Sequence, residues 1–149
     1  EVEIVYKVGK MGKHIAPEFA MKYISEVGIG IDFTARDLQD KAKEKSLPWE
    51  IAKAFDNAAV VSDFIPISDV QTGNIDFSLD VNGKKVQIGN TKNMIFSIEQ
   101  IIAYISKFIT LKTGDLIFTG TPEGVGAVKQ GDKLELFIGE NKKLEFSVK

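Results

Sequence analysis

The sequence predicts a mixed α+β fold in which strands dominate. Residues 75–88 alternate apolar and polar side chains on both sides of Asn82-Gly83, a dipeptide typical of two-residue β-hairpins. Residues 133–148 alternate in the same way and turn near Gly139, which indicates a second hairpin. Apolar residues recur at helical spacing only in short segments, so we expect a few peripheral helices.

The first thirty residues predict a strand, a helix and a second strand. Residues 1–8 alternate as a strand, and residues 17–26 carry apolar side chains at helical spacing behind a proline. Residues 27–31 are apolar throughout, as in a strand buried on both faces, and Asp32 ends that run. A carboxylate in such a place needs a cation or several hydrogen-bond donors.

Two helical segments are expected next. Residues 34–41 predict a helix with Thr34 as its N-cap and Asp37 completing a capping box, which leaves Asp37 a structural role. Residues 47–53 predict a short helical turn that begins at a proline, with Trp49 buried.

The second half predicts one more helix and a glycine-rich loop. Ser97 and Gln100 form a capping-box pattern that opens an apolar helix over residues 98–108. A short apolar strand at residues 116–118 runs directly into the loop at residues 119–126. That loop lacks the Gly-Lys-Ser/Thr ending of a phosphate loop, which argues against nucleotide binding.

Composition limits the kinds of partner. The 149 residues suit a single domain, and 19 basic against 21 acidic residues give a net charge of −2 without a long block of either sign. We therefore expect small-molecule partners, no nucleic acid and no membrane. The absence of cysteine excludes thiolate metal sites and fits a cytoplasmic location.

Three acids indicate a metal site. Glu1 and Glu3 are two residues apart in a predicted strand, so their side chains share a face, and Asp32 ends a neighbouring apolar strand. Carboxylates packed together repel one another and would protonate unless a hard divalent cation offsets their charge. Without Asp32 and the motifs further along the chain, the spacing of Glu1 and Glu3 favours solvent-facing acids on an edge strand over metal ligands. Asp32 alone could be a buried acid bound by nearby N–H groups.

The motifs resemble those of the fumarylacetoacetate hydrolase family in identity and order. The matching motifs are Glu-x-Glu, a Gly-Lys loop, Ile-Asp-Phe-Thr-Ala-Arg-Asp-Leu-Gln, Pro-Trp with Ala-Lys-x-Phe, Val-Asn-Gly, Met-Ile-Phe-Ser and Thr-Gly-Thr-Pro-x-Gly-Val-Gly. Within the family, the chain is most similar to the small acylpyruvate hydrolase and oxaloacetate decarboxylase branch. The resemblance implies a β-rich, roll-like mixed sheet and a homodimer.

The resemblance also implies metal ligands. Glu1, Glu3 and Asp32 match the positions that hold Mg²⁺ or Mn²⁺ in the family, and Ca²⁺ could take their place in a crystal. Three protein oxygens leave room for a short 2-oxo or 2,4-dioxo acid, which chelates through its carboxylate and keto oxygens. The metal would then stabilise the enolate formed when acylpyruvates are hydrolysed or oxaloacetate is decarboxylated.

The remaining family positions imply a substrate pocket. Lys53 and Thr121 match the catalytic lysine and hydroxyl that contact the substrate carboxylate, together with backbone N–H groups at Gly120. Arg36 and Gln39 match further pocket positions, where they could meet the far end of the substrate or support the metal ligands.

The chain departs from the family pattern at its start. In the family, a segment upstream of Glu-x-Glu carries the His and Glu that activate the hydrolytic water. We expect residues 1–149 to be a single catalytic domain that lacks this segment. His14, the only histidine, follows the Gly-Lys loop and does not match the catalytic position.

Other functions remain open at this level. The same fold could serve an isomerase or tautomerase of 2-hydroxy-dienoic or oxo acids. The chain could also be a non-catalytic β module in which the metal is structural. Coordination separates these possibilities, because an enzyme leaves metal positions for water or substrate, whereas protein oxygens close a structural site.

Overall fold

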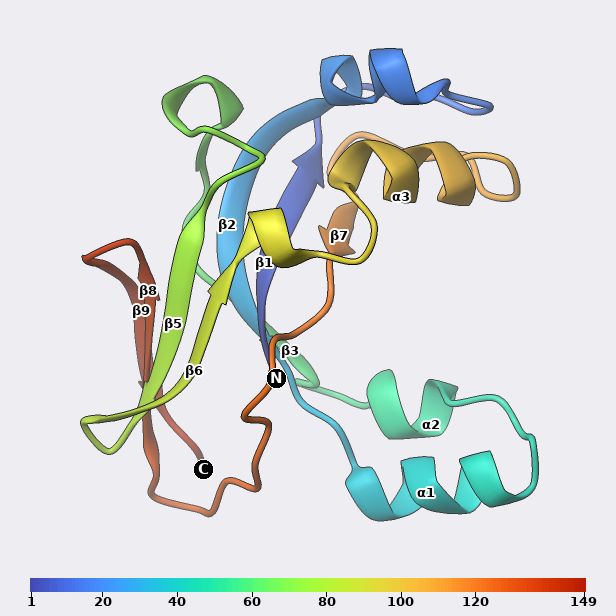
Figure 1. Cartoon of the computed structure of the whole chain (residues 1–149). Coiled ribbons are helices and arrows are strands. Elements are labelled where there is room, and N and C mark those ends of the chain that lie inside the picture. Colours follow the sequence, from blue (N-terminus) through green and yellow to red (C-terminus); the bar gives the residue numbers. More distant parts are fainter.

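The computed structural model describes residues 1–149 as two antiparallel β-sheets with short helices at their ends (Figure 1). One sheet has the strand order β3-β2-β1-β7, with β4 also paired to β2, and the other has the order β6-β5-β8-β9. The strands of the first sheet are β1 (Val2–Val8), β2 (Ile24–Asp32), β3 (Ala59–Val61), β4 (Ile65–Pro66) and β7 (Leu116–Phe118). Those of the second are β5 (Asp76–Val81), β6 (Lys84–Asn90), β8 (Lys133–Ile138) and β9 (Asn141–Ser147).

The helices are short and lie at opposite ends of the sheets (Figure 1). The α-helices are α1 (Arg36–Glu44), α2 (Glu50–Lys53) and α3 (Ile98–Ile105), and the 3₁₀ helices are η1 (Pro17–Tyr23), η2 (Ile67–Asp69) and η3 (Thr91–Asn93). In Figure 1, η1 and α3 lie together at one end, whereas α1 and α2 lie at the other end, near the start of β1. None of the helices has the length and apolar character needed to span a membrane.

The hydrophobic core fills the space between the two sheets. Alternate residues of β1 and β2 pack against β5 and β8, and Ile4, Ile29 and Leu136 are fully buried there. Both hairpins agree with the sequence. Asn82 and Gly83 join β5 to β6 with φ angles of 52° and 76°, the left-handed values that an Asn-Gly turn favours.

The α+β fold and the roll-like β architecture are as predicted, but predictions for three helical segments need correction. Residues 17–26 do not form one helix, because the chain leaves η1 at Tyr23 and Ile24 already pairs with Val8 of β1. Trp49 is 47% exposed instead of buried, and the ammonium of Lys43 lies 5.1 Å from its ring centroid.

Helix capping was predicted correctly for α3 and wrongly for α1. Ser97 Oγ accepts a hydrogen bond from the Gln100 N–H, and Gln100 Oε1 accepts one from the Ser97 N–H, which completes the capping box. Helix α1 instead begins at Arg36 without a side-chain cap. The Thr34 hydroxyl oxygen accepts a hydrogen bond from Lys53, and this long-range contact replaces the local one.

Candidate metal and substrate site

Three carboxylates converge where β1 begins and β2 ends. Val2 points into the core between Glu1 and Glu3, so the two glutamates share the opposite face of β1. The Asp32 N–H donates to the Glu1 carbonyl at 2.9 Å, which places Asp32 beside them. One carboxylate oxygen from each acid lies within 4.8 Å of the other two. This is a spacing at which a single cation can contact all three.

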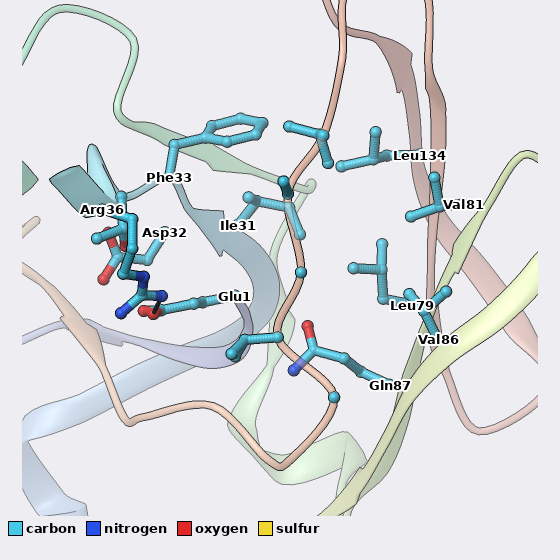
Figure 2. A pocket seen from close by; sticks show the side chains of 16 residues that line it. Glu1, Ile31, Asp32, Phe33, Arg36, Leu79, Val81, Val86, Gln87 and Leu134 are labelled. Carbon is cyan, nitrogen blue, oxygen red and sulfur yellow. Dashed lines mark hydrogen bonds and ion pairs between the residues drawn. The ribbon is translucent and has the colours of Figure 1, made fainter.

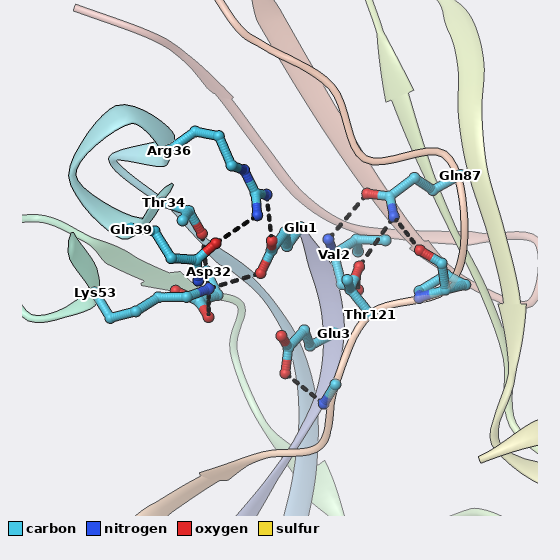
Figure 3. A network of polar contacts seen from close by, with 12 residues as sticks. Glu1, Val2, Glu3, Asp32, Thr34, Arg36, Gln39, Lys53, Gln87 and Thr121 are labelled. Atoms are coloured by element: carbon cyan, nitrogen blue, oxygen red, sulfur yellow. Dashed lines mark hydrogen bonds and ion pairs between the residues drawn. The ribbon is translucent and has the colours of Figure 1, made fainter. Parts of the chain in front are cut away.

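Two basic side chains reach this acidic cluster from the α1–α2 segment (Figure 3). Lys53 Nζ donates to Glu1 Oε2, Asp32 Oδ2 and Thr34 Oγ1, each at 2.7 Å. Arg36 donates from Nη2 to Glu1 Oε1 at 2.6 Å, and from Nη1 to the buried Gln39 Oε1 at 2.7 Å. Gln39 therefore orients Arg36 and does not itself touch the acids.

The electrostatics of the two glutamates differ. Burial raises the pKa of Glu3, which is only 5% exposed, and the charges of Asp32 and Glu1 raise it further, against the hydrogen bond from the Gly120 N–H. Burial also acts most strongly on Glu1, but hydrogen bonds from Lys53 and Arg36 together outweigh it and lower the Glu1 pKa. Burial lowers the pKa of Lys53, but its hydrogen bonds to Asp32 and Glu1 outweigh this effect, so the pKa is raised overall.

Glu3 is thus the acid whose charge is least compensated. Its Oε2 accepts the Gly120 N–H at 2.7 Å, and its other oxygen has no hydrogen-bond partner within the chain. A divalent cation bound by Glu3, Glu1 and Asp32 would supply the missing positive charge. Carboxylate oxygens are ligands that suit Mg²⁺ and Mn²⁺. The residues present therefore fit the predicted metal.

The glycine-rich loop after β7 lies along β1. Besides the bond from Gly120 to Glu3, the Thr121 hydroxyl donates to the Val2 carbonyl at 2.8 Å, and the Thr119 hydroxyl donates to the Ile4 carbonyl at 2.8 Å. The Thr121 proton is therefore directed at the protein backbone, whereas the Thr121 backbone N–H has no acceptor within the chain. That N–H is a donor available to a bound anion.

Gln87 is a member of this network that the sequence did not reveal (Figure 3). The alternation of Val86 and Ile88 in the hairpin predicts that these two face the core, but Gln87 is 2% exposed and Ile88 is 70% exposed. The register shift at Leu79/Asp80 in the pairing of β5 with β6 accompanies this reversal. A glutamine between two apolar residues gave no local signal for it.

A cavity of about 460 Å³ opens beside the acidic cluster (Figure 2). Glu1, Asp32 and Arg36 line its polar side, and Leu79 and Leu134 of the second sheet line its apolar side. A small organic acid could therefore approach the cluster from between the sheets.

His14 lies elsewhere. It has a φ of 51° in the segment between β1 and η1, and its N–H donates to the Ser106 carbonyl just beyond α3. Figure 1 shows α3 and the N-terminal end of β1, where Glu1 lies, at opposite ends of the first sheet, so His14 is remote from the acidic cluster.

Comparison with known proteins agrees with the motifs. Residues 1–149 match the family described as Fumarylacetoacetate (FAA) hydrolase C-terminal. The chain belongs to the fumarylacetoacetate hydrolase family. It is 44% identical to a mitochondrial oxaloacetate tautomerase of Rattus norvegicus, covering 99% of this chain and 67% of the relative. It is 41% identical to a mitochondrial oxaloacetate decarboxylase of Dictyostelium discoideum, covering 99% of this chain and 69% of that protein.

Solved structures of this family have the same fold. The crystal structure of a fumarylpyruvate hydrolase from Pseudomonas aeruginosa, in complex with Mn²⁺ and pyruvate, superposes with a TM-score of 0.94 at 39% identity. The match covers 99% of this chain and 64% of that one. The chain thus spans about two thirds of the length of the relatives it matches.

Proposed function

We propose that this domain belongs to a divalent-metal-dependent enzyme that acts on short 2-oxo acids, with keto–enol tautomerisation or decarboxylation of oxaloacetate as its main reaction. The observation that carries the proposal is the convergence of the Glu1, Glu3 and Asp32 carboxylates beside Lys53. The oxaloacetate tautomerase and decarboxylase among its relatives support this choice of substrate.

Each part of the site has a role in binding a dianionic acid. Glu1, Glu3 and Asp32 would hold Mg²⁺ or Mn²⁺, which when bound supplies Lewis acidity to substrate oxygens. The ammonium of Lys53, which bridges Glu1 and Asp32, can pair with a substrate carboxylate or an oxygen that gains negative charge. The free N–H of Thr121 can donate a hydrogen bond to a substrate carboxylate at the loop.

Arg36 would meet the second carboxylate of a dicarboxylic substrate. Its guanidinium lines the cavity and is bonded to Glu1 and Gln39, which fix its direction. A planar guanidinium binds a carboxylate through two parallel hydrogen bonds, so Arg36 would favour oxaloacetate over a monoacid.

Tautomerisation makes the smallest chemical demand on these groups. The enol O–H loses a proton and carbon 3 gains one, with no bond between heavy atoms broken and no attacking water. Charge stabilisation at the enolate oxygen is the main requirement, and the cationic groups of the site provide it. Decarboxylation of oxaloacetate also forms an enolate, so it needs the same stabilisation of negative charge on the enolate oxygen.

A second candidate is hydrolysis of acylpyruvates such as fumarylpyruvate. The fumarylpyruvate hydrolase of similar fold favours it. This reaction additionally needs a base that activates water, and Glu1, Glu3 and Asp32 are the only carboxylates of the cluster. A non-catalytic metal-binding module is the remaining alternative.

Assays with Mg²⁺ on oxaloacetate, acetylpyruvate and fumarylpyruvate separate these possibilities. We expect the protein to accelerate ketonisation of enol-oxaloacetate, measured as the loss of enol absorbance. We expect Glu3→Gln to lose that activity while its circular dichroism spectrum shows that the fold is retained. Preferred cleavage of an acylpyruvate would select the second candidate. If the protein with Mg²⁺ converts none of the three compounds faster than Mg²⁺ alone does, an enzymatic role is refuted.

A further inference from the structure

We propose that Gln87 is a positioning residue that holds the metal-binding end of β1 and the substrate loop in one fixed arrangement. The inference rests on the proposed function for its consequences in catalysis. Its structural basis is a set of hydrogen bonds that join the two sheets at the site.

The edge of β1 is open where its metal-binding residues lie. Strand β7 pairs with β1 only from Val5 to Lys7, so the groups of Val2 on that edge have no strand partner. Side chains replace the missing strand. The Val2 N–H donates to Gln87 Oε1 at 3.1 Å, and the Val2 carbonyl accepts from the Thr121 hydroxyl at 2.8 Å. Val2 separates Glu1 from Glu3, so both bonds act directly between the two predicted ligands.

The other end of the Gln87 amide holds the loop. Gln87 Nε2 donates to Thr121 Oγ1 and to the Pro122 carbonyl, both at 2.9 Å. Because the Thr121 oxygen accepts from Gln87, its own proton is left to donate to Val2. Gln87 thereby sets the direction of the Thr121 hydroxyl and, with it, the position of the free Thr121 N–H.

A glutamine side chain satisfies these requirements and its close analogues do not. The site demands one acceptor and two donors at the end of a side chain that reaches from the second sheet to the first. Glutamate keeps the acceptor but has no donor, and asparagine is one methylene shorter. At 2% exposure, loss of the amide would also leave the Val2 N–H and the Pro122 carbonyl without partners in a water-poor region.

The same loop touches β6 one residue earlier. Gly124 has a φ of 97°, and a Cβ atom there would lie 2.4 Å from the Val86 carbonyl oxygen. The loop therefore meets β6 at two neighbouring points, the Val86 carbonyl and the Gln87 side chain, which is the arrangement expected if β6 serves as its support.

Gln87→Met tests the inference, since methionine keeps the length and volume of the side chain and removes all three hydrogen bonds. Ser106→Ala is the matched control. Ser106 is also fully buried and joins distant segments, through bonds from the Ile15 N–H and to the Ala103 carbonyl, but it lies beside α3 and away from the acidic cluster. A general loss of stability would affect both variants.

We expect Gln87→Met to weaken Mn²⁺ binding, measured from the electron paramagnetic resonance of free Mn²⁺, by about tenfold relative to the parent. Hydrogen exchange at residues 119–124 should accelerate by a similar factor, and KM for the oxo acid should rise more than kcat falls. Ser106→Ala should change none of these. Gln87→Glu keeps the acceptor for Val2 and adds a negative charge near the ion, so it should not weaken Mn²⁺ binding, whereas KM should rise.

A combined variant checks the path through Thr121. If Gln87 acts by orienting that hydroxyl, Gln87→Met should raise KM much less in a Thr121→Val background than in the parent. Equal changes in exchange and Mn²⁺ affinity in Gln87→Met and Ser106→Ala would overturn the inference. Failure of the parent to convert any oxo acid would instead count against the proposed function. The hydrogen-exchange and Mn²⁺-binding measurements would still test the positioning role of Gln87.

Discussion

Lys53 is the main cation of the acidic cluster. It bridges Glu1 and Asp32 with two hydrogen bonds of 2.7 Å and draws its raised pKa from them despite its partial burial. The ammonium would repel a divalent ion bound by the same acids. It would also attract a dianionic substrate and help to balance its charge. In the proposed site, Lys53 would therefore oppose metal binding and favour substrate binding.

Replacing Lys53 with methionine should separate these two effects. We expect Lys53→Met to bind Mn²⁺ several-fold more tightly, because one positive charge is removed from the neighbourhood of the ion. Oxaloacetate turnover should fall by about 10²-fold or more, because the substrate loses a charged partner. Lys53→Arg, which keeps the charge, is the control. Weaker Mn²⁺ binding in Lys53→Met would show that Lys53 supports the metal ligands.

The sequence predicted the acidic residues because their signals are local. Alternation along a strand puts Glu1 and Glu3 on one face, and an acid at the end of an apolar run marks Asp32. Gln87 could not be found in this way. Its role depends on the open edge of β1, a contact between residues 85 positions apart.

At the scale of the element, β1 carries both the site and the centre of the core. Tyr6 of β1 is fully buried, and its hydroxyl donates to the Thr72 carbonyl at 3.2 Å. Burial, with a further contribution from the charge of Glu99, raises the pKa of Tyr6 to about 12 from 10.0. The phenol therefore stays neutral in the folded chain at pH values where it ionises in the unfolded chain.

This shift predicts a loss of stability in alkali. A raised pKa contributes stability that is complete below pH 10 and is lost as the pH rises towards 12, by about 2–3 kcal/mol for this group. Urea unfolding at pH 9 and pH 11.5 should show a smaller loss in Tyr6→Phe than in the parent. Tyr104→Phe, at an exposed tyrosine of α3, should behave as the parent does. Equal losses in all three proteins would contradict the assignment.

The loop after β7 depends on glycine at one position and not at another. An alanine at Gly124 must move the loop away from Val86 and adopt an unfavourable φ, whereas a Cβ at Gly126 meets nothing within 4 Å. We expect Gly124→Ala to lower the free energy of unfolding by about 1–3 kcal/mol and to raise KM. Gly126→Ala is the matched control and should leave the free energy of unfolding unchanged. Equal behaviour of the two variants would show that the contact with β6 is unimportant.

Local signals also decided which elements were predictable. The Asn82-Gly83 turn and the Ser97-Gln100 capping box are complete within a few residues, and both are present. Thr34 had the same kind of local signal, but Lys53 takes its hydroxyl and helix α1 begins without it. At Thr34, a contact with a charged group from a distant segment replaced the local cap.

At the scale of the whole molecule, an apolar surface beside η3 predicts a homodimer. Ile95 is 91% exposed, and it lines a hollow together with the exposed Ile88 and Phe96 and with the loop at Gly120 and Thr121. Exposed apolar patches of this kind are typical of protein interfaces. A second copy bound there would also cover the outer side of the substrate loop.

Sedimentation at micromolar concentration tests the predicted dimer. We expect the parent to sediment as a dimer and Ile95→Asp as a monomer, because a buried carboxylate without a partner opposes association. Ile51→Asp, at an isoleucine of α2 that is 78% exposed, should remain dimeric. A monomeric parent would contradict the prediction.

The position of a bound metal ion decides whether Glu1, Glu3 and Asp32 form a metal site. Crystals grown with Mn²⁺ and measured near its absorption edge should give an anomalous difference peak between the carboxylates of Glu1, Glu3 and Asp32, and Glu3→Gln should weaken or abolish it. A peak elsewhere, or none in the parent at Mn²⁺ concentrations that saturate solution binding, would contradict a metal-dependent site at these residues.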